Sequence, residues 1–108
     1  MSYKIGDIVL VKFPFTDLKK YKRRPVLVIK DENVYGDIVC FQITSNQNQD
    51  ALIQIKKGDF GADKLNLASF VKYDKCFTIN SSVVEKKIAD VNKAFLSNLK
   101  SSFCQEIL

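Results

Sequence analysis

The sequence predicts a mainly β domain in which five or six short strands form a strongly bent antiparallel sheet or partly open barrel, closed by one C-terminal helix. Short apolar and β-branched runs alternate with clusters of turn residues along most of the chain. The C-terminal segment instead has apolar residues at helical spacing. The chain has 108 residues, which is enough for one hydrophobic core, so we expect a single domain over residues 1–108.

The strands are expected where apolar runs are bounded by turn residues. Residues 26–29 are apolar on both faces, which is typical of a central strand. Turn residues between 31 and 37 indicate that the following strand runs antiparallel to it. In chain order, the expected strands are 7–13, 26–29, 38–44, 52–55, 68–73 with an extension at 77–79, and 83–88.

A closing helix is expected from Lys93 onward, with Asn92 as its N-cap. Its apolar residues recur every three or four positions, so one face of the helix is expected to pack on the sheet. This apolar stripe consists of Phe95, Leu96, Leu99, Phe103 and Ile107.

Charge and composition narrow the class of protein without choosing its partner. The net charge of +5 and a pI near 9.1 suit either a nucleic acid or an acidic protein partner. No apolar run approaches the ~20 residues that span a bilayer. The N-terminal residues also lack the pattern of a signal peptide, so we expect a cytoplasmic protein without a membrane partner.

The cysteines argue against a disulfide framework and against a zinc site. Cys40, Cys76 and Cys104 are far apart, and the sequence has neither a histidine nor a CxxC pair. We therefore expect three buried structural thiols, with no metal and no cofactor.

A strongly basic segment joins the first two predicted strands. Its cations repel one another, so a solvated surface loop is one interpretation. The other is a nucleic-acid-binding loop in which cations contact phosphates and aromatic residues stack on unpaired bases, although Phe15 also fits the core. The candidate binding residues are Phe15, Lys19, Lys20, Tyr21, Lys22 and Arg23.

Arg24 differs from the other cations because Pro25 follows it. The proline biases Arg24 toward an extended conformation at the entrance of a strand, where a planar guanidinium suits a phosphate. A polar loop at 45–50 follows the third strand. Its residues Ser45, Asn46 and Gln47 are candidates for reading base edges, and an untethered polar loop is the alternative.

Four segments occur in a distinctive order along the chain: GDIVLV at 6–11 with FP at 13–14, RRPVLVI at 23–29, QITS at 42–45, and FVKYDKCFTI at 70–79. Together they resemble the MazF/PemK family of toxin ribonucleases, and with the closing helix the resemblance covers essentially the whole chain. It implies an SH3-like barrel with a C-terminal helix, usually a homodimer, which cleaves single-stranded RNA without a metal and is neutralised by a cognate antitoxin.

The resemblance also implies which residues are catalytic. The arginine before the proline and the threonine that ends the third strand fall on Arg24 and Thr44. An arginine and an aspartate of the later signature correspond to Lys72 and Asp74. Lys72 departs from the family pattern, because lysine keeps the charge but lacks the bidentate fork of arginine.

The residue types themselves favour electrostatic catalysis of this cleavage. Without a histidine, the usual proton shuttle at neutral pH is missing. Arg24 is expected to bind two phosphate oxygens, and Thr44 to donate its hydroxyl proton to the same phosphate or to hold the nucleophile. Asp74 either accepts the proton of the 2′-hydroxyl or pairs with Lys72 on the same strand face.

Two other classes of function remain open on the sequence alone. One is a nucleic-acid-binding barrel without catalysis, which would keep the basic surface. The other is a protein-interaction module whose cationic groove binds an acidic peptide. Removal of Arg24 distinguishes the enzyme from both, because only an enzyme has cleavage to lose.

Overall fold

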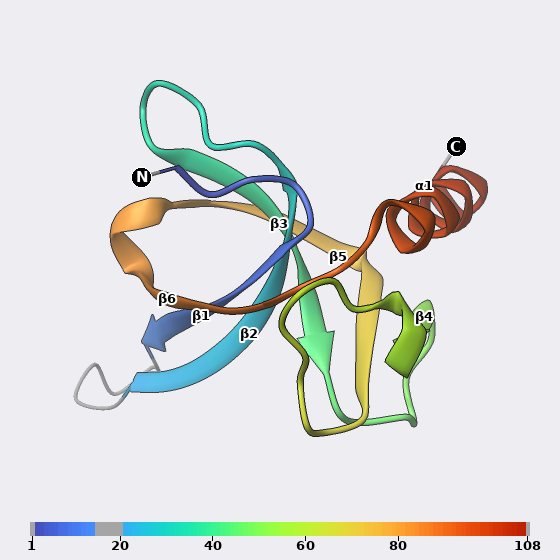
Figure 1. Ribbon diagram of the computed structural model, residues 1–108. Helices are drawn as coiled ribbons and strands as arrows, with labels where there is room; N and C mark the ends of the chain where they lie inside the picture. The colour runs from blue at the N-terminus through green and yellow to red at the C-terminus, as the bar shows by residue number, and fades with distance from the viewer. Residues whose placement is uncertain (1, 15–20, 108) are drawn as a thin grey trace.

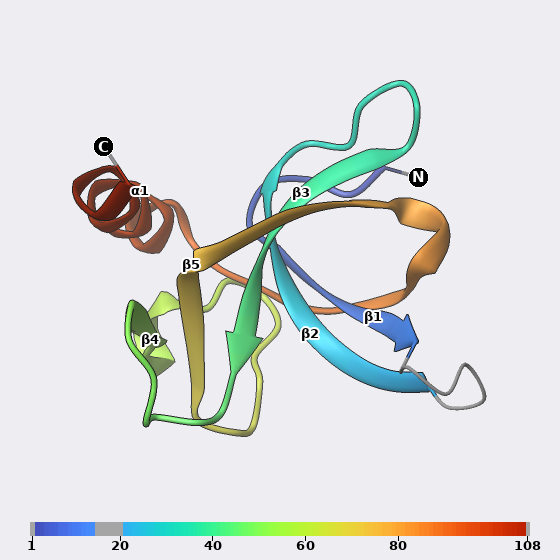
Figure 2. The same cartoon turned by 180° about the vertical axis from the view of Figure 1, so that it is seen from behind.

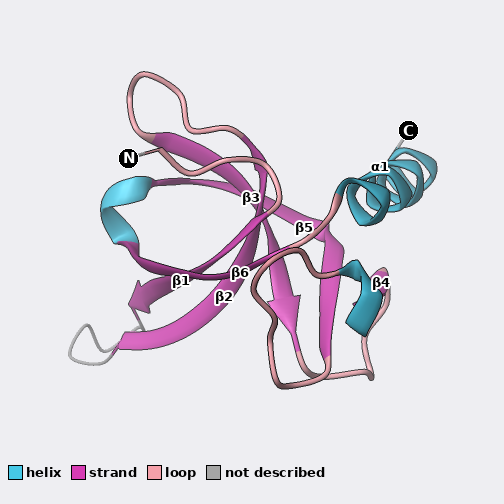
Figure 3. Cartoon of the chain, in the orientation of Figure 1, coloured by secondary structure: helices cyan, strands magenta, loops and turns pink. Residues whose placement is uncertain are grey.

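The computed structural model describes residues 2–14 and 21–107. Within these ranges six strands form one antiparallel sheet in the order β4-β5-β3-β2-β1-β6 (Figures 1 and 3), which confirms the mainly β prediction. The sheet is open, with β4 and β6 at its edges. The elements are β1 (Asp7–Pro14), β2 (Tyr21–Lys30), β3 (Asp37–Thr44), β4 (Leu52–Ile55), η1 (Lys57–Asp59), β5 (Ser69–Asn80), η2 (Ser81–Val83), β6 (Val84–Asp90) and α1 (Lys93–Ile107).

The sheet buries both of its faces because it bends strongly. On one face, Val9, Val26 and Val28 lie in a cluster of small apolar residues. On the other face, Leu27 and Phe41 lie in a second cluster together with residues of α1. This explains why residues 26–29 are apolar on both sides, and it confirms that β2 is a central strand.

β5 is the strand along which the sheet changes direction (Figures 1 and 2). One half of β5 pairs with the beginning of β3, and the other half pairs with both β3 and β4. The register shifts between these halves, because Phe41 pairs with Cys76 while its neighbour Gln42 pairs with Lys72. Residues 73–75 therefore form a bulge, a feature that bends strands and redirects side chains.

The closing helix forms as predicted. The Asn92 side chain caps it by accepting a hydrogen bond from the backbone N–H of Phe95 at 2.9 Å. Phe95 and Leu99 are each only 2% exposed and belong to the core, and Leu96 and Phe103 pack against it. Of the predicted stripe, the side chain of Ile107 lies outside the described residues. Both overall views show α1 beside β4 and β5, on the opposite side of the molecule from the end of β1 (Figures 1 and 2).

Several sequence predictions need correction. β2 begins at Tyr21 rather than at residue 26, because its pairing with β1 continues as far as Pro14 and Tyr21. Arg23 and Arg24 therefore lie within a strand and not in a loop at its entrance. β5 is one continuous strand because the bulge accommodates the interruption that the sequence suggested.

The prediction of three buried thiols holds only for Cys40. Burial, with a smaller effect of the nearby Cys76, raises the pKa of the Cys40 thiol to about 12, so this thiol stays protonated near neutral pH. Cys76 is exposed and Cys104 is partly buried, because β5 and α1 turn these positions away from the core. All three cysteines are free thiols. Within the described ranges, no helix combines the length and the apolar character that crossing a membrane requires.

Candidate nucleic-acid interface

A cleft of about 500 Å³ brings together Arg24 and Thr44. β2 and β3 are antiparallel, and Val26 pairs with Gln42. Arg24 lies two residues before Val26 and Thr44 two residues after Gln42, so both lie toward the same end of this strand pair. Residues two apart on a strand share a face, so both side chains emerge on the same side of the sheet. The remaining lining comes from β2, β3 and the residue after it, β6, the connection between β4 and β5, and the start of β5: Arg23, Pro25, Ile43, Ser45, Leu65, Asn66, Leu67, Ala68, Ser69 and Ile88.

The two arginines of this cleft differ in what they contact. The Nε atom of Arg23 lies 2.6 Å from a carboxylate oxygen of Glu85 on β6. This hydrogen bond and the attraction between the charges raise the pKa of Arg23 and lower that of Glu85. Within the described part of the chain, the guanidinium of Arg24 has no hydrogen bond and no ion pair. Arg24 is therefore the cation of the cleft that can bind an incoming anion without breaking an existing contact.

The hydrogen bonds around Thr44 direct its hydroxyl group. Its oxygen Oγ1 accepts a hydrogen bond from the backbone N–H of Asn46 at 3.1 Å and a longer one from Nε2 of Gln49 at 3.5 Å. A hydroxyl oxygen has two acceptor positions, and both are engaged here. The hydroxyl proton is left to be donated, so Thr44 is suited to stabilise an oxyanion and not to accept a proton.

A second hollow, of about 440 Å³, shares Arg24 with the first. It is lined by Arg24, Gln42, Lys75 and Phe77. Lys75 and Gln42 are not among the candidates that the sequence predicts, although both lie within segments that resemble the toxin family. Lys75 reaches this hollow because it lies in the β5 bulge, which local sequence patterns do not reveal. Arg24 and Lys75 together make this part of the surface cationic.

Lys72 and Asp74 lie on β5 and do not line either hollow around Arg24. Nζ of Lys72 lies 3.0 Å from a carboxylate oxygen of Asp74, so the expected pairing of the two side chains is present. The same ammonium donates a hydrogen bond to the backbone carbonyl of Asp50 at 2.9 Å. The Lys72 side chain is only 11% exposed. Its contacts therefore attach the loop after Thr44 to β5.

The comparisons with known proteins identify the family of this chain. A family model described as "PemK-like, MazF-like toxin of type II toxin-antitoxin system" matches residues 4–107. The chain belongs to this toxin family. Its members are known as endoribonucleases. No curated protein sequence matches the toxin significantly.

Solved structures of MazF toxins have the same fold. The MazF of a MazE–MazF complex from Deinococcus radiodurans matches with a TM-score of 0.77 and 18% identity, over 97% of this chain and 95% of that one. An endoribonuclease in complex with its cognate antitoxin, from a mycobacterial species, matches with a TM-score of 0.73 and 13% identity, over 95% and 92%. The Mycobacterium tuberculosis toxin MazF-mt6 matches with a TM-score of 0.63 and 18% identity, over 94% and 91%. At these identities the structures establish the fold of the toxin.

The other predicted binding residues of the toxin lie in different places. Ser45 lines the cleft, whereas Asn46 and Gln47 do not. The side-chain oxygen of Asn46 accepts a hydrogen bond from the backbone N–H of Asn48 at 2.9 Å, so it stabilises the loop itself. Phe15, Lys19 and Lys20 lie outside the described residues, and for Tyr21 and Lys22 only the backbone is described.

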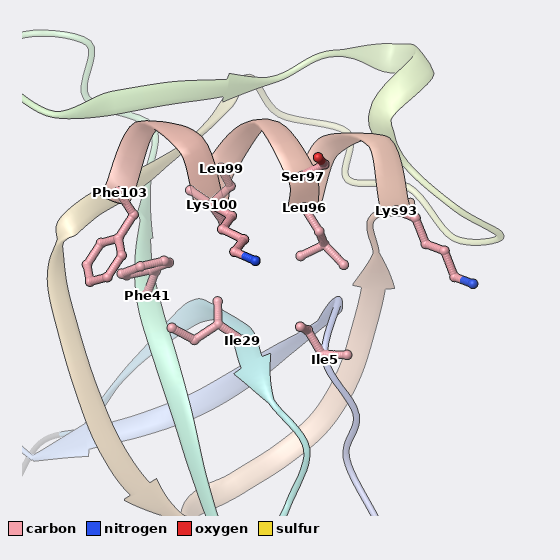
Figure 4. A pocket seen from close by; sticks show the side chains of 9 residues that line it. All are labelled: Ile5, Ile29, Phe41, Lys93, Leu96, Ser97, Leu99, Lys100 and Phe103. Atoms are coloured by element: carbon pink, nitrogen blue, oxygen red, sulfur yellow. The ribbon is translucent and has the colours of Figure 1, made fainter. Parts of the chain in front are cut away.

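A third hollow, also about 500 Å³, lies between α1 and the sheet of the toxin. Figure 4 shows Leu96 and Phe103 of α1 pointing toward Ile5, Ile29 and Phe41. Its charged lining residues are Lys93 and Lys100, both on α1 and both exposed. This lining suits an apolar group that carries or adjoins a negative charge. It suits a polyanionic RNA strand less well than the cleft of Arg24 does.

Proposed function

We propose that this toxin is a metal-independent endoribonuclease that cleaves single-stranded RNA. The observation that carries the proposal is the Arg24 guanidinium, which has no partner among the described residues and shares a cleft with the proton-donating hydroxyl of Thr44. Such a pair provides donors in a fixed arrangement for a phosphate that gains negative charge. The mycobacterial structures of the same fold are described as endoribonucleases, which supports this class of reaction.

In the proposed reaction, the 2′-oxygen of a ribose attacks the adjacent phosphorus. The new bond from the 2′-oxygen to phosphorus forms as the bond from phosphorus to the 5′-oxygen breaks. The 2′-hydroxyl loses its proton to solvent and the leaving 5′-oxygen takes up a proton from solvent, which leaves a cyclic phosphate and a 5′-hydroxyl. Arg24 binds two nonbridging oxygens, where negative charge accumulates, and Thr44 donates a hydrogen bond to the same group. The sequence has no histidine, so this stabilisation supplies most of the rate enhancement.

We infer that Lys72 supports the site by positioning the loop after Thr44. Lys72 holds the carbonyl of Asp50, and the backbone N–H of Tyr73 donates to the carbonyl of Ala51 at 3.0 Å. This loop supplies the two hydrogen bonds that orient the Thr44 hydroxyl. Direct catalytic roles for Lys72 and Asp74 remain predictions, as do the RNA contacts of the basic segment. The homodimer and the cytoplasmic location remain part of the proposal.

The test is to incubate the purified toxin with a long RNA of mixed sequence in EDTA and to map new ends by primer extension. We expect cleavage in EDTA, because the reaction needs no metal. The cuts should be discrete and share a short sequence. Cuts that appear only when Mg²⁺ is restored would contradict metal independence. RNA that remains intact in both conditions, with folded protein, would contradict the nuclease assignment.

We also infer that a cognate antitoxin inhibits the toxin, and that an apolar, acidic segment of it occupies the hollow beneath α1. The apolar lining with Lys93 and Lys100 provides complementary charge for such a segment (Figure 4). Related toxins have been solved in complex with their antitoxins.

We expect the double substitution of Lys93→Glu and Lys100→Glu to weaken binding of the protein encoded beside the toxin gene by about tenfold or more. RNA cleavage without the antitoxin should stay unchanged. Isothermal titration calorimetry measures the affinity. A matched control reverses the charges of two other lysines by Lys56→Glu and Lys57→Glu. Both are exposed and do not line the hollow. Equal affinities for the two double variants would show that the antitoxin binds elsewhere.

A further inference from the structure

The cleft of Arg24 and Thr44 has a second part that the proposed chemistry does not use. The connection between β4 and β5 contributes Leu65, Asn66, Leu67 and Ala68 to the lining, and Ser69, the first residue of β5, follows them. Figures 1 and 2 both show this connection folded beside the end of β3, which carries Thr44. None of these five residues is ionisable, so this part of the cleft offers apolar surface and a few hydrogen-bonding groups.

The connection is held in place although most of it has no regular secondary structure. The backbone N–H of Gly61 donates to the carbonyl of Asp90 at 2.9 Å, and the side-chain amide of Asn92 donates to the carbonyl of Gly58 at 2.8 Å. Leu65 packs against the core cluster beneath α1. Near the other end, Oγ of Ser69 donates to the carbonyl of Leu67 at 2.9 Å. These contacts hold both ends of the connection in place, and this lowers the cost of ordering it when a ligand binds.

Asn66 is the polar side chain of this wall that has no task within the fold. Ser69 is engaged by Leu67, whereas the amide of Asn66 makes no hydrogen bond to any residue that the structure describes. An asparagine amide presents a donor and an acceptor side by side, which matches the edge of a nucleobase. Leu65 and Leu67 provide apolar surface for the face of the same base.

We propose that the connection between β4 and β5 forms a nucleobase subsite in which Asn66 reads the edge of the base next to the phosphate at Arg24 and Thr44. This inference rests on the proposed nuclease function. It assigns part of the sequence preference to residues 65–69. The amide loop at 45–50 instead orients Thr44, as the contacts of Asn46 and Gln49 show.

The test compares the wild type with Asn66→Ala on an RNA library of random sequence in EDTA, with every cut site sequenced. We expect the variant to keep cutting RNA because Arg24 is intact. Its preference for one base at a position beside the cut should fall by roughly 5- to 100-fold. The control is Asn98→Ala, which removes an exposed amide from α1 that does not line the cleft. It should cut with the wild-type preference.

A binding measurement separates failure of this inference from failure of the proposed function. Four oligonucleotides that differ only at the base in question, each with a 2′-deoxy nucleotide at the cut position, are titrated by fluorescence anisotropy. Base discrimination that disappears in Asn66→Ala supports the subsite even if the toxin cuts no RNA. Unchanged discrimination in Asn66→Ala, in cutting or in binding, would overturn the subsite while leaving the nuclease function intact. An absence of base discrimination in the wild type would overturn it as well.

Discussion

Arg24→Ala is expected to lower the rate of RNA cleavage by about 10²–10³-fold, the usual effect of removing one donor to a developing oxyanion. The Arg24 side chain has no hydrogen bond and no ion pair among the described residues, so the substitution removes no such contact from the fold. RNA affinity should fall far less, because one phosphate contact among several is lost, and the salt dependence of binding should decrease by about one unit of slope. Single-turnover cleavage and anisotropy titrations at several salt concentrations measure the two effects separately.

Two further variants make this experiment specific. Arg23→Ala removes the same charge from the same cleft, but the Arg23 guanidinium is already paired with Glu85, so we expect a much smaller loss of rate. Arg24→Lys keeps the charge and removes the fork, so its rate should lie between those of the wild type and Arg24→Ala. If Arg24→Ala and Arg23→Ala cleave RNA equally fast, Arg24 is not the residue that stabilises the transition state.

Phe95→Ala is expected to destabilise the toxin by about 3–5 kcal/mol, the range for truncating a buried phenylalanine. Phe95 is 2% exposed and lies where α1 packs on the sheet, so its removal leaves a cavity between the two. Domains of this kind have only about 5–15 kcal/mol of stability, so the loss is a large part of the total. Chemical denaturation monitored by circular dichroism gives the free energy of unfolding.

The control for Phe95 is Tyr35→Ala, which truncates an aromatic side chain that is 79% exposed. It should change the free energy of unfolding by about 0.5 kcal/mol or less. A loss below about 1 kcal/mol for Phe95→Ala would show that α1 does not depend on this contact for its packing.

The fold could be predicted from the sequence where its signals are local. The bounds of β4 and the N-cap of α1 were predicted correctly, because apolar spacing and a capping residue act over a few neighbouring positions. Arg24 could be selected as a candidate because it lies between a basic segment and a proline, and Thr44 because the segment at 42–45 resembles the toxin family. The sequence alone therefore determined the fold class, the order of most elements and the two central residues of the candidate site.

The tertiary structure decided which side chains meet. The start of β2 depends on its pairing with β1, and the position of Lys75 beside Arg24 depends on the bulge in β5. Glu85 and Arg23 are 62 positions apart in the sequence and meet because β6 and β2 lie on either side of β1 in the folded sheet. Asn66 joins the cleft only because the connection between β4 and β5 folds beside β3. Register, bulges and loop placement follow from the packing of the whole sheet, and no local pattern encodes them.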